Sequence, residues 1–225
     1  MRENLHDNLN VALYNIFMFV RNNVRMEEGW YLYHASCSEI DGRTYMFLGH
    51  SGAGKTTLSA FLHYHPRVVT IAEDLCVVNY LDLEVESVNR PFFLRRSSYN
   101  LLTSCYGLKL PNSDEIVYNV DKKIVVQKNH IESLKRYKID QIFLLNLCKD
   151  GLKKNEINDK LELVKYSYIA TDIFKGVQSA ISLCKSVPMH ELRYYDLNEV
   201  YSFLLNMNDQ SKVKNSNTGS ERIIE

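Results

Sequence analysis

A run of eight residues, 49–56, has the composition and spacing of a phosphate-binding loop. It reads Gly-His-Ser-Gly-Ala-Gly-Lys-Thr and fits the pattern G-x-x-x-x-G-K-[ST]. Its glycines let the backbone curl so that N–H groups point at phosphate oxygens, while Lys55 supplies a charge for the β and γ phosphates and Thr56 a hydroxyl for Mg²⁺. The sequence therefore predicts a bound nucleoside triphosphate with magnesium. The residues predicted to bind it are Gly49, His50, Ser51, Gly52, Ala53, Gly54, Lys55, Thr56 and Thr57.

Two adjacent acids, Glu73-Asp74, follow the loop at the end of a strand-like run, 68–72, that we expect to lie beside the loop strand. Phosphoryl transfer needs a carboxylate for the metal and a group that takes a proton from the acceptor. We expect Asp74 to join Thr56 as a metal ligand, which leaves Glu73 to orient or deprotonate a hydroxyl. The alternative interpretation is an acidic pair in a solvated turn.

A histidine precedes the loop by 15 residues, because His34 lies in a run, 30–40, that reads as a strand. Asp41-Gly42 is a two-residue hairpin signal, which would make this strand the antiparallel neighbour of the strand entering the loop. The register decides whether His34 lies near the phosphates or far from them, and sequence does not fix it. A histidine satisfied within the core is the alternative.

A basic pair, Arg95-Arg96, lies in a loop-rich region. It could clamp a transferred phosphoryl group or an acidic peptide. A pair of solvated surface charges explains it equally well.

The elements that must position these residues indicate an α/β fold. Residues 43–48 read as a buried strand and 57–62 as a helix, so the loop lies in a strand-loop-helix unit. Residues 139–147 are a continuous apolar run, typical of a strand buried on both faces. Further along, 187–195 resembles a last edge strand, and 197–205 a closing helix.

Composition and charge narrow the class of protein. The 225 residues carry 27 acidic and 27 basic side chains, so no global field favours nucleic acid or an anionic membrane. Five widely spaced cysteines without a C-x-x-C pair predict reduced thiols and a cytoplasmic location. We expect an amphipathic helix within 1–28 that packs on the domain, one nucleotide-binding domain over 29–207, and a disordered polar tail over 208–225.

The order and spacing of these motifs resemble a known family. Leu32-Tyr33-His34-Ala35-Ser36, the turn, the loop, Glu73-Asp74 and the segment 186–194 are similar to the C-terminal catalytic domain of HPr kinase/phosphorylase. They are more similar to the smaller HPr-kinase-like proteins of peptide-modification systems, such as lasso-peptide pathways. The resemblance implies a phosphoenolpyruvate carboxykinase-like P-loop fold, in which helices flank a mixed β-sheet.

The same resemblance implies an activity and partners. It implies an ATP-dependent kinase that transfers the γ-phosphoryl group to a hydroxyl, such as serine of a peptide or protein acceptor, with Mg²⁺ as cofactor. Glu73 matches the family's proton-accepting acid, and His34 the histidine that works near it. Relatives assemble into oligomers, which leaves a homo-oligomer open.

Two other functions remain as alternatives. The first is a nucleotide-binding interaction module without transfer chemistry. The glutamate at position 73 favours it, because the family usually has two aspartates where this chain has Glu73-Asp74. The missing signature for the HPr substrate also favours it. A GTPase-type switch has weaker support, since no N-K-x-D segment that would read guanine is present.

Overall fold

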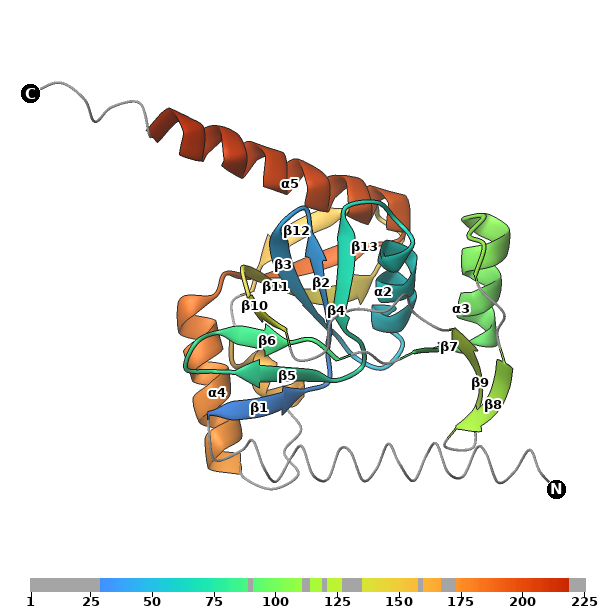
Figure 1. The fold of residues 1–225 in the computed structure, drawn as a ribbon, viewed down its shortest axis with the longest axis horizontal. Helices are drawn as coiled ribbons and strands as arrows, with labels where there is room; N and C mark the ends of the chain where they lie inside the picture. Colours follow the sequence, from blue (N-terminus) through green and yellow to red (C-terminus); the bar gives the residue numbers. More distant parts are fainter. Residues whose placement is uncertain are drawn as a thin grey trace, which may run out of the picture.

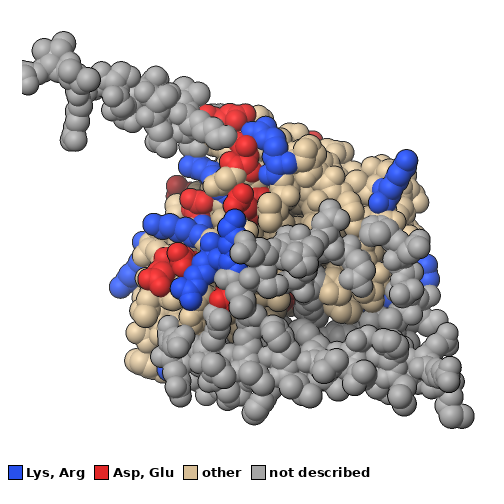
Figure 2. Space-filling view, in the orientation of Figure 1, with Lys and Arg blue, Asp and Glu red and all other residues tan. Residues whose placement is uncertain are grey.

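The computed structural model describes residues 29–88, 91–110, 114–118, 121–126, 135–157, 160–166 and 173–218. The predicted N-terminal helix within 1–28 lies outside the described residues. Among the helices that are described, none has the length and apolar character needed to cross a membrane. On the face shown in Figure 2, acidic and basic side chains of described residues are interspersed.

The central element is a six-stranded mixed sheet with the order β12-β13-β11-β3-β2-β4 (Figure 1). Strands β3, β11 and β13 are parallel, and the remaining pairings are antiparallel. The predicted Asp41-Gly42 hairpin joins β2 to β3, and both of its residues have positive φ angles, 52° and 84°, as a type I′ turn requires. The strands are β2 (Ser36–Ile40), β3 (Arg43–Leu48), β4 (Val68–Ala72), β11 (Gln141–Leu147), β12 (Lys153–Glu156) and β13 (Met189–Tyr194).

Two smaller antiparallel sheets complete the β structure. The four-stranded sheet contains β1 (Trp30–Tyr33), β5 (Cys76–Asn79), β6 (Glu84–Glu86) and β10 (Arg136–Lys138). The three-stranded sheet contains β7 (Phe92–Arg95), β9 (Asp121–Val126) and β8 (Asp114–Tyr118). The single strand predicted over 30–40 is therefore two strands in different sheets, because β1 pairs with β5 whereas β2 pairs with β3 and β4.

Helices cover the sheets on two sides (Figure 1). The helical segments are α2 (Lys55–His63), α3 (Arg96–Asn100), the π-helical turn η2 (Leu101–Cys105), the 3₁₀ segment η3 (Lys160–Tyr166), α4 (Ile173–Ser186) and α5 (Leu197–Thr218).

Successive residues of β3 pack into different cores. Met46 belongs to a core with the four-stranded sheet and α4, whereas Phe47 belongs to a core with α2 and α5. Both faces of the strand are thus buried, which explains its continuous apolar run. The predicted α/β fold, a mixed sheet flanked by helices around a P-loop, is confirmed.

Three predictions of element position differ from the structure. The strand predicted over 187–195 as an edge is internal, because the polar strand β12 pairs along its outer side. Strand β4 is separated from the loop strand by β2. Helix α5 continues to Thr218 instead of ending at 205, so the predicted boundary at 207/208 falls inside a helix.

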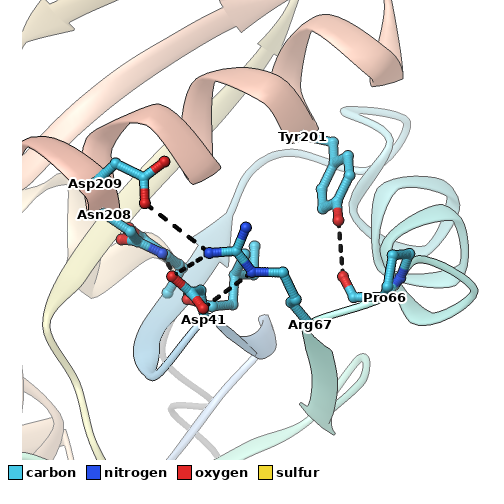
Figure 3. Close-up of polar contacts among 8 residues, drawn as sticks. Asp41, Pro66, Arg67, Tyr201, Asn208 and Asp209 are labelled. Carbon is cyan, nitrogen blue, oxygen red and sulfur yellow. Dashed lines mark hydrogen bonds and ion pairs between the residues drawn. The ribbon is translucent and has the colours of Figure 1, made fainter.

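Contacts with the hairpin and with the turn before β4 explain why α5 stays packed past that boundary (Figure 3). Asn208 is 1% exposed; its Nδ2 donates to the Ile40 carbonyl at 2.6 Å, and its Oδ1 accepts from the Tyr45 hydroxyl. Arg67, in the turn before β4, donates to Asp41 at 3.0 Å, and its Nη2 lies 3.9 Å from Asp209 Oδ1 of the helix. The helix is thus tied to the far end of the β2–β3 hairpin.

Replacing Asn208 by alanine should lower the free energy of unfolding by about 1–3 kcal/mol, because it removes two buried hydrogen bonds, one to the Ile40 carbonyl and one from the Tyr45 hydroxyl. Urea denaturation measures the change. Asn198→Ala, at an exposed position of the same helix, is the matched control and should change stability by less than about 0.5 kcal/mol. Equal effects of the two substitutions would contradict the anchoring role of Asn208.

Candidate active site at the phosphate-binding loop

The loop connects the end of β3 to the start of α2, as the strand-loop-helix prediction requires. Lys55 is the first residue of α2, and Gly54 before it has φ 87°. No described side chain caps the start of this helix. The first N–H groups of α2 therefore face the loop, where an anion can accept from them.

Tyr194 shapes the loop from β13, which lies two strands from β3. Its hydroxyl donates to the Ala53 carbonyl at 2.8 Å, and a Cβ placed on Gly54 would collide with the same oxygen. Burial raises the pKa of Tyr194, which keeps its hydroxyl protonated as a donor. Sequence reasoning did not identify this residue as part of the site, because its partner lies 141 positions away.

Lys55 is held beneath the loop. Its Nζ donates to the carbonyls of Gly49 at 2.6 Å and His50 at 3.3 Å, and the residue is 7% exposed. Burial lowers the pKa of Lys55, while the charges of Asp74 and then Glu73 act in the opposite direction. The two acids are therefore close enough to act electrostatically on the lysine that reaches the phosphates.

His34 and Asp74 meet where two neighbouring chain segments pass from one sheet into the other. Ser36 pairs with Phe47, so the start of β2 lies beside the end of β3. The register that the sequence left open therefore brings His34 to the loop end of β3 and not to the opposite end. His34 lies between β1 and β2, Asp74 lies between β4 and β5, and His34 Nε2 is 3.0 Å from Asp74 Oδ1. Both side chains are partly exposed, at 39% and 35%.

Glu73 is placed differently from its neighbour, since it is only 1% exposed. It directly follows Ala72, the buried last residue of β4, and its side chain is buried in the interior of the protein. The sequence assigned the proton-handling role to Glu73, whereas the acid bound to His34 is Asp74.

A cavity of about 340 Å³ joins these parts. Its polar wall is the loop and the start of α2, and His34 lies in the same cavity. A second wall comes from β7, α3 and η2, and a third from the ends of β11 and β13 and the start of α5. The predicted residues that line the cavity are His34, Ser51, Gly52, Gly54, Lys55, Thr56, Thr57 and Arg95.

The other predicted residues are not among those that line the cavity. Gly49, His50 and Ala53 contribute carbonyl oxygens to the contacts that hold Lys55 and Tyr194. Asp74 reaches the cavity through His34. Arg95 lines the cavity, but its neighbour Arg96 is not among the lining residues, so the basic pair does not act there as a unit.

The donor set suits a triphosphate with Mg²⁺. The described part of the chain contains no cluster of three or more His, Cys, Asp or Glu side chains that could hold a metal. Mg²⁺ commonly takes one or two protein ligands and completes its shell with phosphates and water. Thr56, with a carboxylate from the pair at 73–74, fits that mode.

Comparisons with known proteins find likenesses among solved structures. No family model matches the chain, and neither does any curated protein. Among solved structures, the Hpr(Ser) kinase/phosphatase from Coxiella burnetii is similar, with a TM-score of 0.40 and 8% sequence identity. The match covers 85% of this chain and 99% of that one.

Gly54→Ala should abolish detectable binding of ATP, because the added Cβ collides with Tyr194 in addition to the strain of a positive φ. Gly52→Ala is the matched control, since Gly52 has φ 89° and nothing within 4 Å of an added Cβ. It carries the conformational strain without the collision and should weaken binding far less. Isothermal titration with ATP measures both, and similar losses would contradict the role of Tyr194.

Proposed function

We propose that this protein is an ATP-dependent kinase of the HPr kinase type, which transfers the γ-phosphoryl group to a hydroxyl such as serine of a peptide or protein. The observation that carries the proposal is that His34, which is hydrogen-bonded to Asp74, lines the same cavity as the phosphate-binding loop. Holding a nucleotide requires only the loop. An imidazole hydrogen-bonded to a carboxylate beside it supplies the acid–base function that transfer needs.

The residues take the following roles in this proposal. The loop amides and Lys55 would hold the phosphates, and Thr56 would hold Mg²⁺, which when bound would supply positive charge to the phosphate oxygens. The acceptor oxygen bonds to the γ-phosphorus while the bond from that phosphorus to the β–γ bridging oxygen breaks, and ADP leaves. The acceptor proton passes to a carboxylate. Arg95 adds positive charge within the cavity.

The geometry favours Asp74 over Glu73 as the carboxylate that takes the proton. Asp74 is partly exposed and bonded to His34, which lines the cavity, whereas Glu73 is buried. A general base must come within hydrogen-bond reach of the proton that it removes. We therefore assign proton transfer to Asp74, its orientation to His34, and to Glu73 a negative charge beside Lys55.

The competing function is a nucleotide-binding interaction module, in which ATP stabilises one conformation for a partner. Both functions require the loop, so binding of ATP does not distinguish them. Transfer of phosphate to an acceptor does distinguish them.

Because a kinase needs a continuous supply of ATP, we place the protein in the cytoplasm.

Asp74→Asn should lower phosphoryl transfer by about 10²–10⁴-fold, because the amide cannot accept the proton. ATP affinity should stay the same or rise, since a negative charge near the phosphates is removed. Transfer is measured as radiolabel moved from [γ-³²P]ATP to a library of serine-containing peptides, and affinity by titration.

Glu199→Gln is the matched control, because it removes an exposed carboxylate from the first turn of α5. It should leave both quantities unchanged. Wild-type protein that binds ATP yet labels no peptide in the library would favour the interaction module. An Asp74→Asn variant that transfers phosphate at the wild-type rate would remove Asp74 from the reaction.

A further inference from the structure

Three exposed apolar side chains gather at the phosphate cavity. Among the described residues, six large hydrophobic side chains are exposed, and three of these, Leu101, Leu147 and Tyr195, line this cavity. Their exposed fractions are 39%, 49% and 60%. Exposed hydrophobic side chains that are scattered singly over a surface need no explanation, whereas a group of them beside a polar loop indicates a binding surface.

The walls that carry these side chains are fixed to the loop and to each other. The Thr57 hydroxyl donates to Ser98 Oγ at 2.8 Å, which ties α3 to the start of α2. The Leu197 backbone N–H donates to the Tyr106 hydroxyl at 3.1 Å, which ties the end of η2 to the start of α5. The apolar surface is thus built into the fold around a cavity of about 340 Å³, within the size range of small-molecule sites.

The direction in which the triphosphate lies in the loop determines which end of the nucleotide is near these apolar side chains. Lys55 reaches the β and γ phosphates, and it lies within electrostatic range of Asp74. The terminal phosphate therefore points toward the His34–Asp74 pair, where the acceptor must enter. The nucleoside extends from the other end of the phosphate chain, toward Leu147 and Tyr195 at the ends of β11 and β13, because these strands lie on the opposite side of β3 from β2 and β4.

We propose that Leu101, Leu147 and Tyr195 form the subsite for the base of the nucleotide. This inference rests on the proposed function, because it assigns one end of the same cavity. A planar base offers two apolar faces, and Tyr195 offers an exposed aromatic ring on which such a face can stack. Leu101 and Leu147 supply aliphatic contacts from two other elements.

The test compares ATP with inorganic tripolyphosphate, which carries the phosphates without the nucleoside. Tyr195→Ala should weaken binding of Mg-ATP by about 5- to 150-fold, the range seen when a stacked aromatic is removed, and should leave tripolyphosphate affinity within about twofold. Leu147→Ala should change the two affinities in the same direction as Tyr195→Ala, by a smaller factor. Isothermal titration of each variant measures both ligands.

Phe174→Ala is the matched control, because Phe174 is 78% exposed and does not line the cavity. It should change neither affinity. Equal weakening of ATP and tripolyphosphate by Tyr195→Ala, or no weakening of either, would overturn the base subsite and leave the kinase proposal standing. A Tyr195→Ala variant that keeps its ATP affinity but loses peptide labelling would assign the surface to the acceptor. Wild-type protein that binds neither ligand would overturn the proposed function itself.

Discussion

The site depends on one antiparallel strand pairing that continues from one sheet into another. Cys37 of β2 pairs with Ala72 of β4, and Tyr33 of β1 pairs with Cys76 of β5. Between these pairs both chain segments leave the six-stranded sheet together and enter the four-stranded one. Side chains at the two crossovers are thereby placed opposite each other, and the contact between His34 and Asp74 follows from this pairing.

The position of this crossover relative to the loop is fixed by the hairpin. The tight Asp41-Gly42 turn allows one register between β2 and β3, and that register brings the beginning of β2 to the end of β3. A slip of one residue would exchange the two faces of β2 and move side chains such as Cys37 and Ile40 out of the separate cores into which they pack. Burial of both faces of the sheet therefore holds His34 beside the loop, and the contacts of α5 with the hairpin reinforce the same register.

Local chemistry explains which parts of this arrangement could be predicted. The loop, the helix after it, the hairpin and the apolar strand β11 each depend on neighbouring residues, and all were predictable. The break at His34 was not, because the runs 30–33 and 36–40 both read as strand, and only the choice of pairing partner separates them. Strand β12 reads Lys-Lys-Asn-Glu and has no strand signal; it exists because β13 offers an open edge.

The difference between Glu73 and Asp74 shows why the roles of an acidic pair cannot be assigned from its order in the chain. In a regular strand the two side chains would simply point to opposite faces. Here Asp74 adopts a left-handed conformation with φ 62°, which costs a non-glycine residue about 1–2 kcal/mol. Because Asp is among the residues that tolerate this conformation best, the chain can turn at position 74 and still present a carboxylate to His34. The turn that ends the pairing with β2 is therefore also what separates a buried acid from an accessible one.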